Sequence, residues 1–462
     1  MYRYLLTTLS TVLFFIAYGQ SITGDWTGNL EIQGMKLPLV LHVTQKGDTL
    51  VSTMDSPAQG AKGIPVNNTA FANNSLNFEI RNLGISYKGL MAGDSISGTF
   101  TQGGFSIPLV LQRETGEKAT VVNRPQTPQP PFHYAIEEVS FTNPTEGNTL
   151  AGTLTTPSGK KQFPVVVMIT GSGAQDRDET LFGHKPFWVI ADHLAQNGIG
   201  ALRLDDRGVG GSSRGQEGAT SADFATDIEA AVNFLYKKGF KNIGLIGHSE
   251  GGMIAPMVAV QNKNVKFIVT MAGPGIPVDS LMLIQNREVS KTSGASAEEI
   301  SENLSASREI FGLLKSYTGN DIKTALKNKL QTWMDADTTK SDDQKEKFIS
   351  QQIEQVTSPW FLYFIKFNPD TFLGQVKIPV LAINGSKDVQ VAAKENLSAI
   401  EKSLQKAGNK NFEVAELPGL NHLFQEAKTG AVSEYVTIEQ TISPTVLKLI
   451  TDWIQKTSKP IK

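Results

Sequence analysis

The sequence predicts an α/β domain, with a parallel sheet wrapped by helices, preceded by a small antiparallel all-β domain. Three observations predict this fold class. Apolar and polar residues alternate with a period of two over much of 21–115, which is typical of strands with one buried face. From residue 132 onward, short apolar runs alternate with amphipathic helical stretches, as in strand–helix–strand units. Helix-forming sequence at 277–372 then interrupts this alternation.

Composition limits the classes of function. The chain has 462 residues, enough for two or three domains, and is 40% hydrophobic and 19% charged, as in folded proteins. Lys and Arg number 43 and Asp and Glu 45, so the whole-chain charge does not favour binding to nucleic acid or an anionic membrane. The absence of cysteine excludes disulfides, thiol nucleophiles and Cys-ligated zinc.

The N-terminus has the features of a secretory signal peptide at residues 1–19. Arg3 supplies a positive charge, residues 5–17 are an apolar run, and Ala17 and Gly19 are small residues at the positions that precede a cleavage site. The run is shorter than the roughly 20 residues that a membrane-spanning helix needs, so a retained anchor is the less favoured interpretation. We expect a periplasmic or secreted protein with no membrane contact after cleavage.

Residues 20–115 are predicted to form the all-β domain. Alternation is regular at 37–43, 76–80 and 107–111, and no helical stretch is visible, so a small barrel or sandwich is the expected closure. A proline-rich linker is predicted at 116–131, because such segments are extended and semi-rigid. Its prolines are Pro125, Pro128, Pro130 and Pro131.

Residues 132–462 are predicted to form the α/β domain. The strands are expected at 132–141, 149–155, 164–169, 200–204, 243–246, 265–271, 378–383 and 412–417. The helices are expected at 185–196, 222–237, 251–260, 392–405 and 445–455. Residues 277–372 lie between two late strands, and such insertions usually cover the C-terminal ends of the strands, where ligands bind. We therefore expect 277–372 to form a helical cap.

The pattern G-x-S-x-G occurs twice, and its context separates the two matches. Ser249, within Gly247–Gly251, directly follows an expected strand and opens an expected helix, as a nucleophilic serine on a sharp turn requires. Ser213, within Gly211–Gly215, lies in a glycine-rich loop with no helix after it. We therefore predict Ser249 as the nucleophile and interpret Ser213 as a loop residue.

A nucleophilic serine needs a base, and the base needs a carboxylate to orient it. His422 lies in a loop after the last expected strand, where this chain order places the base. Asp388 follows the strand at 378–383 and is the predicted acid, with Glu416 in reserve. His248 is adjacent to the nucleophile, and its side chain is expected to point elsewhere.

An oxyanion requires hydrogen-bond donors near the nucleophile. One predicted donor is the backbone N–H of Glu250, and the other is the N–H of Ser172 or Gly173, after the strand at 164–169. The alternative for this glycine-containing loop is phosphate binding, but no G-K-[ST] follows it.

Several of these segments together resemble the α/β-hydrolase superfamily, in particular secreted bacterial serine esterases of the prolyl-oligopeptidase-like group with a β-rich N-terminal domain. The resemblance covers about 132–462. It implies an α/β-hydrolase fold with a triad of Ser249, Asp388 and His422 and no metal or organic cofactor. The segments that carry it are Gly171–Glu179, Asp206–Ser212, Gly247–Gly251, Asn384–Asp388 and Leu420–Gln425.

We therefore predict a secreted serine carboxylesterase that hydrolyses small to medium acyl esters through an acyl-enzyme. A serine exopeptidase of the same superfamily is the alternative, although the β domain is too small for a propeller. A binding protein on an inactive scaffold is a third hypothesis. Trp360, Phe361 and Phe424 are predicted substrate contacts, although aromatic clusters are more often core. The expected partner is a small-molecule ester, and the oligomeric state stays open.

Overall fold

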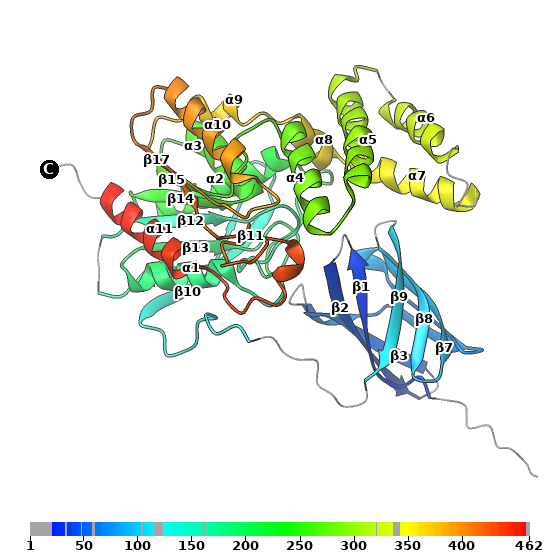
Figure 1. Cartoon of the computed structure of the whole chain (residues 1–462). Helices are drawn as coiled ribbons and strands as arrows, with labels where there is room; N and C mark the ends of the chain where they lie inside the picture. Colours follow the sequence, from blue (N-terminus) through cyan, green and yellow to red (C-terminus); the bar gives the residue numbers. More distant parts are fainter. Residues whose placement is uncertain are drawn as a thin grey trace, which may run out of the picture.

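A computed structural model describes residues 21–32, 35–47, 49–57, 61–102, 105–114, 123–159, 162–319, 321–335 and 342–458. The predicted signal peptide, residues 1–19, lies outside the described residues, as does most of the first half of the predicted linker. Figure 1 shows a curled sheet of N-terminal strands beside an α/β body whose added helices project from one end. Among the described residues, no helix is both long and apolar enough to cross a membrane.

The N-terminal part is one antiparallel sheet, which confirms the predicted small all-β domain. Its strands are β1 (Gly24–Ile32), β2 (Met35–Lys46), β3 (Thr49–Ser56), β4 (Ala61–Pro65), β5 (Asn68–Ala72), β6 (Ser75–Ile80), β7 (Ile85–Ala92), β8 (Ser95–Gln102) and β9 (Phe105–Arg113). The strand order is β4-β3-β2-β1-β9-β8-β7-β6-β5. Burial alternates strictly along β7, so one face of the sheet encloses a core. That core includes Trp26, Leu41, Phe78, Tyr87 and Phe100.

The second sheet has the order β10-β11-β13-β12-β14-β15-β16-β17. Its strands are β10 (Tyr134–Thr142), β11 (Thr149–Pro157), β12 (Val165–Ile169), β13 (Gly200–Leu204), β14 (Ile243–His248), β15 (Val265–Met271), β16 (Val380–Gly385) and β17 (Phe412–Leu417). Along this order, each strand from β13 to β17 is parallel to its neighbour. Strand β11 pairs antiparallel with both β10 and β13. Strands β12, β13 and β14 are buried at every residue, because helices cover both faces.

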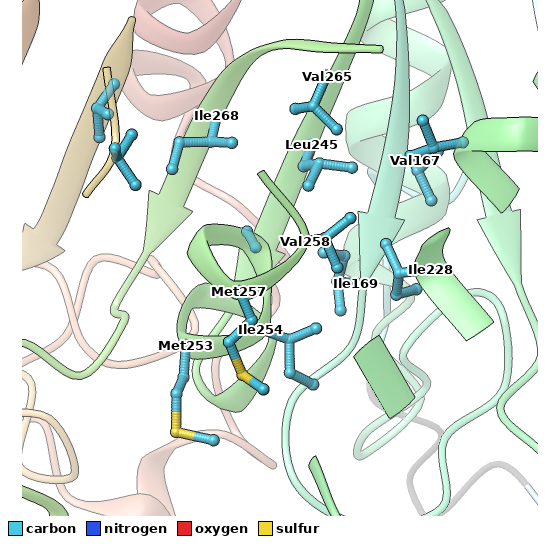
Figure 2. Close-up of a cluster of buried hydrophobic side chains, with 14 of the residues drawn as sticks. Val167, Ile169, Ile228, Leu245, Met253, Ile254, Met257, Val258, Val265 and Ile268 are labelled. Atoms are coloured by element: carbon cyan, nitrogen blue, oxygen red, sulfur yellow. The ribbon is translucent and has the colours of Figure 1, made fainter. Parts of the chain in front are cut away.

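Helices α1 (Pro186–Gln196) and α11 (Pro444–Thr457) pack on one face of this sheet, and α2 (Ser221–Lys237), α3 (Glu250–Gln261) and α10 (Ala393–Lys406) pack on the other. Figure 2 shows the contact of α3 with the sheet, where Met253, Ile254 and Val258 lie near side chains of β12, β14 and β15. Helix α3 is apolar around most of its circumference and almost fully buried, so it fixes the turn that precedes it.

Six helices lie between β15 and β16 among the residues that the structure describes. They are α4 (Val278–Thr292), α5 (Ala297–Ser316), α6 (Ile322–Asp335), α7 (Asp342–Val356), α8 (Pro359–Lys366) and α9 (Asp370–Leu373). They occupy the range in which the sequence predicts a cap. These helices enclose a small core of their own, which includes Phe311, Leu314, Leu326, Ile349 and Ile365. Figure 1 shows α4 and α8 next to the α/β body and α5, α6 and α7 farther out.

The segment that leads into the second sheet is bound to it before β10 begins. The Arg124 guanidinium donates to the carbonyls of Phe182, Val436 and Ile438 at 2.6 to 3.2 Å. The β domain makes a separate contact through β2, where Leu37 packs on a cluster formed by Phe182, Leu423 and Tyr435. Leu423 directly follows His422, so the β domain touches the loop that carries the predicted base.

Candidate active site

Ser249 occupies the turn between β14 and α3 in a conformation that residues with side chains rarely adopt. Its φ is 52° and its ψ is −118°, and its N–H donates to the Met271 carbonyl at 2.9 Å. Strain of this kind persists only where the surroundings hold it, and it turns the serine side chain out of the strand–helix junction.

Steric contacts require glycine two residues before and two residues after Ser249. A Cβ at Gly247 would lie 2.0 Å from the Gly251 carbonyl oxygen, and a Cβ at Gly251 would lie 2.2 Å from the Ile169 carbonyl oxygen. Because contacts this short are forbidden, the turn can form only with glycine at both positions. The second match lacks this context: Ser213 lies in a loop and accepts a hydrogen bond from the Thr149 N–H at 2.8 Å.

Asp388 and His422 form a hydrogen bond, with 2.8 Å between Oδ2 and Nδ1. The other carboxylate oxygen of Asp388 accepts the backbone N–H groups of Gln390 at 2.8 Å and Val391 at 2.9 Å. An ionised carboxylate only accepts, so Nδ1 of His422 carries the proton and Nε2 has a free lone pair. This is the tautomer that a general base on a serine requires.

The loop of His422 is held by the side chain of its neighbour. Asn421 is fully buried, and its Oδ1 accepts the N–H groups of Leu423 at 3.1 Å and Gln425 at 2.9 Å. Its Nδ2 donates to the Gln425 side chain at 2.9 Å. This closed pattern leaves the loop few alternative conformations and so fixes the imidazole position.

His248 bridges two loops of the site. Its Nδ1 lies 2.9 Å from Glu179 Oε1 and its Nε2 lies 3.0 Å from the His422 carbonyl oxygen. The His422 carbonyl oxygen can only accept, so Nε2 carries a proton, and the carboxylate of Glu179 favours a second proton on Nδ1. Burial acts to lower the pKa of His248, but the charge and hydrogen bond of Glu179 outweigh it and raise the pKa. Glu179 also accepts the Gly171 N–H at 2.7 Å, which ties the loop after β12 to the histidine loop.

The predicted oxyanion donors lie around this loop. Glu250 is the first residue of α3, where backbone N–H groups have no partner within the helix. Its buried side chain accepts hydrogen bonds from Ser221 Oγ at 2.5 Å and Trp360 Nε1 at 2.9 Å. Because the Gly171 N–H is already bonded to Glu179, the remaining predicted donors in the loop are those of Ser172 and Gly173.

Two cavities meet at this point. A cavity of 280 Å³ is lined by both Ser249 and His422, together with Trp360 and Phe361. A second cavity of 490 Å³ lies on the α2 side and is lined by apolar residues of β11, β12, β13, α2 and α3. Trp360 and Phe361, the predicted substrate contacts, thus line the same cavity as Ser249 and His422.

The position of Phe424 contradicts the prediction that this residue contacts the substrate. Its side chain is 0% exposed and packs in the core between the sheet and α11, and its φ is 61°. Its ring meets the ring of His248 edge-on, at 6.3 Å between centroids. Phe424 therefore supports the histidine loop and does not face the catalytic cavity. The positive φ turns its side chain inward, which the sequence pattern does not reveal.

Asp206 lies beside the loop after β12, and the pKa of its carboxyl group is raised. Its carboxylate accepts hydrogen bonds from Thr170 Oγ1 at 2.8 Å and the Gln175 N–H at 2.9 Å. Burial raises the pKa of Asp206 to about 7, the charges of Glu179 and Glu250 add to this, and the two hydrogen bonds oppose it.

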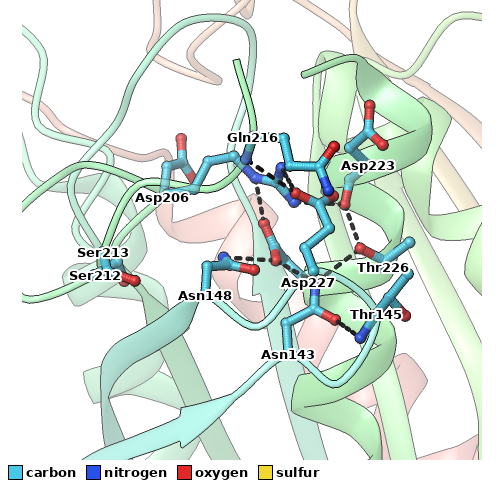
Figure 3. Close-up of polar contacts among 12 residues, drawn as sticks. Asn143, Thr145, Asn148, Asp206, Ser212, Ser213, Gln216, Asp223, Thr226 and Asp227 are labelled. Carbon is cyan, nitrogen blue, oxygen red and sulfur yellow. Dashed lines mark hydrogen bonds and ion pairs between the residues drawn. The ribbon is translucent and has the colours of Figure 1, made fainter. Parts of the chain in front are cut away.

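The neighbouring charged residues form ion pairs with one another. Arg177 is bound to Asp205 at 2.7 Å, and Asp178 pairs with Arg203. Arg207 contacts Asp227 at 2.8 Å and Glu146 at 2.7 Å. Figure 3 shows Asp227 as the centre of a polar network, and its Oδ1 accepts hydrogen bonds from two asparagines, Asn143 and Asn148. These groups stabilise the loops at the ends of β11 and β13.

Comparison with known proteins identifies the family of the chain. The family model of the alpha/beta hydrolase fold matches residues 164–424, more than half of the chain. The chain belongs to the α/β hydrolase fold family. Esterase EstD of Thermotoga maritima is 26% identical to this α/β hydrolase over 277 residues, which are 60% of the chain and 58% of EstD. The match thus spans less than two thirds of EstD.

Solved structures similar to this α/β hydrolase include an esterase of Pyrococcus furiosus, with 15% identity, a TM-score of 0.45, and coverage of 73% of this chain and 98% of that chain. Est1E of Butyrivibrio proteoclasticus, solved with ferulic acid bound, has 15% identity, a TM-score of 0.42, and coverage of 69% and 98%.

Proposed function

We propose that this α/β hydrolase is an exported serine carboxylesterase that acts on small to medium acyl esters. The observation that carries the proposal is the hydrogen bond from His422 Nδ1 to buried Asp388, at 2.8 Å, in a cavity that Ser249 also lines. The relative EstD is named an esterase, which supports ester over amide substrates. The reaction needs no metal and no organic cofactor.

In the proposed acylation step, Ser249 Oγ attacks the ester carbonyl carbon while its proton passes to Nε2 of His422. Asp388 stabilises the imidazolium that forms. The carbonyl oxygen becomes an oxyanion that accepts the backbone N–H groups of Glu250 and of Ser172 or Gly173. Collapse of the tetrahedral intermediate breaks the bond to the alkoxy oxygen, which takes the proton from His422 and leaves as the alcohol.

Water then releases the acyl group. His422 accepts a proton from the water as its oxygen attacks the acyl carbonyl, and the same oxyanion donors act a second time. Collapse returns the proton to Ser249 Oγ and frees the carboxylic acid.

Hydrolysis of p-nitrophenyl acetate, butyrate and octanoate by the chain from Gln20 onward tests the proposal. Replacing Ser249 by alanine is expected to lower kcat by at least ~10³-fold. Ser213→Ala is the matched control, because Ser213 is the central serine of the other G-x-S-x-G and is expected to keep full activity. If aminoacyl p-nitroanilides are turned over faster than the esters, the protein is a peptidase and the esterase proposal is wrong. Turnover that survives Ser249→Ala would refute Ser249 as the nucleophile.

Export is proposed from residues 1–19 alone. Expression of the whole chain in a bacterium, followed by fractionation and N-terminal sequencing, tests it. A periplasmic or extracellular product beginning at Gln20 is expected. A product that retains Met1 in the cytoplasm would refute the proposal.

A further inference from the structure

The two cavities share one wall. Gly171, Ser172, Glu250 and Trp360 line both the cavity of 280 Å³ and the cavity of 490 Å³. The wall thus contains the loop after β12 and the residue after the nucleophile, which are the proposed sources of the oxyanion donors. A substrate carbonyl bound by these donors therefore lies at the junction, with its two substituents free to extend into different cavities.

The position of the base decides which substituent enters which cavity. His422 lines the cavity of 280 Å³ and does not line the cavity of 490 Å³. In ester hydrolysis the alkoxy oxygen must reach the base to receive its proton. The alcohol portion is therefore on the side of the smaller cavity, and the acyl portion points across the junction toward the larger one.

The walls of the larger cavity suit an apolar group. Its lining includes the apolar residues Leu150, Ile169, Leu204, Phe224, Ile228 and Ile254. The charged groups in its lining already have partners: Arg207 contacts Asp227 at 2.8 Å, and Asp205 accepts Arg177 at 2.7 Å. Asp206, which also lines this cavity, accepts hydrogen bonds from Thr170 Oγ1 at 2.8 Å and from the Gln175 N–H at 2.9 Å. Glu250 uses Oε1 to accept two hydrogen bonds, one of them from Trp360. A hydrocarbon chain would thus leave these pairs intact while removing apolar surface from water.

We propose that the cavity of 490 Å³ is the acyl pocket and that it takes an apolar acyl group of medium length, such as octanoyl. This inference rests on the proposed function and specifies its substrate class. Trp360 is the partition between the two cavities, held in place by its hydrogen bond to Glu250 at 2.9 Å and by stacking on Phe364, with ring centroids 5.0 Å apart.

The kinetic test changes the two cavities separately. Ala174 lines the larger cavity from an exposed loop, so Ala174→Phe narrows it with little risk to folding. Gln285, on α4, lines the smaller cavity, and Gln285→Phe is the matched control. Each variant is measured on p-nitrophenyl acetate and octanoate, and on octanoate esters of ethanol and of a bulky secondary alcohol.

Ala174→Phe is expected to lower the octanoate-to-acetate ratio of kcat/KM by about tenfold, the effect of excluding one or two methylenes from a pocket. Gln285→Phe is expected to leave that ratio unchanged and to alter the preference between alcohols. The inference is overturned if the acyl ratio changes with Gln285→Phe and not with Ala174→Phe.

A binding measurement separates this inference from the proposed function. Octanoic acid is titrated calorimetrically into the Ser249→Ala protein and into the same protein with Ala174→Phe. Binding that is weakened about tenfold by Ala174→Phe supports the pocket even if no ester is turned over, in which case only the esterase proposal fails. Ester hydrolysis that is lost with Ser249→Ala, together with octanoic acid binding that is insensitive to Ala174→Phe, keeps the esterase and refutes the pocket.

Discussion

Asp206→Asn is expected to change the stability of the protein in opposite directions at low and high pH. Burial raises the pKa of Asp206 to about 7, from an ordinary value of 3.8. The folded state therefore holds a proton on this carboxyl that the unfolded state has lost, over the whole interval between these two values. Stability falls as pH rises across that interval, because the folded protein must give up a favoured proton.

The magnitude follows from the same two values. A difference of one pKa unit corresponds to ~1.4 kcal/mol, so full ionisation of Asp206 costs the folded state about 4 kcal/mol. Asparagine carries no charge at any pH. Its amide oxygen can accept the Gln175 N–H. Its amide nitrogen can donate to Thr170 Oγ1, whereas in the wild-type protein this hydroxyl donates to the carboxylate at 2.8 Å. The pH-independent cost of the substitution is then about 1 kcal/mol, the typical contribution of one hydrogen bond.

The expected result is a crossing of two stability curves. At pH 3, below both pKa values, the wild-type protein should be more stable than Asp206→Asn by about 1 kcal/mol, and at pH 9 the variant should be more stable by about 3 kcal/mol. Urea-induced unfolding, followed by tryptophan fluorescence at both pH values, measures the difference. Asp452→Asn is a matched control, because the side chain of Asp452 is 58% exposed and pairs only with Lys448 among the described residues.

Two results would contradict this reasoning. A difference in unfolding free energy that is the same at pH 3 and pH 9 would show that Asp206 does not titrate in this interval. A variant that becomes relatively less stable as pH rises would show that Asp206 is held ionised by its surroundings, so that its pKa is depressed.

Three further substitutions test the site. Gly251→Ala should yield little soluble protein in an expression trial, because its Cβ would lie 2.2 Å from the Ile169 carbonyl oxygen; a normal yield would contradict the proposed turn. Glu179→Gln removes the partner that raises the pKa of His248, so at pH 6 the melting temperature should fall by about 6 °C, equivalent to ~4 kcal/mol. This loss should be largest below pH 6.5 and vanish as pH rises through the raised pKa; a constant loss would exclude the ion pair. Asp388→Asn should lower kcat by ~10⁴-fold without lowering the melting temperature by more than a few degrees, and wild-type kcat would refute its role.

The sequence predicted the elements that local rules determine. Period-two alternation identified the β domain, and apolar runs with helical intervals identified the parallel sheet, because both patterns record burial directly. Strand–turn–helix context also distinguished Ser249 from Ser213. The joining of Asp388 to His422 followed from chain order, because the carboxyl ends of parallel strands lie at one edge of the sheet.

Other features depend on contacts between distant segments. The sequence predicts only that the His248 side chain points away from the nucleophile, yet it connects Glu179 to the His422 carbonyl across two loops. Phe424 was expected at the substrate, but its positive φ directs the ring into the core. Neither fact has a local signature, since each arises from the way in which three loops meet at the edge of the sheet. The pairing of Glu250 with Trp360, which are 110 residues apart, is of the same kind.

The bonds of Arg124 bear on how this enzyme can be shortened. A truncated chain that starts at β10 would look complete by sheet topology, yet it would lack the side chain that binds the carbonyls of Val436 and Ile438. It would also lack Gln126, which accepts the N–H groups of Thr441 and Ile442 at 2.6 and 3.0 Å. A catalytic unit that keeps these hydrogen bonds must therefore include Arg124 and Gln126. A truncation at 134 would remove these hydrogen bonds to the segment that follows the histidine loop, and any loss of activity that resulted would be wrongly attributed to the missing β domain.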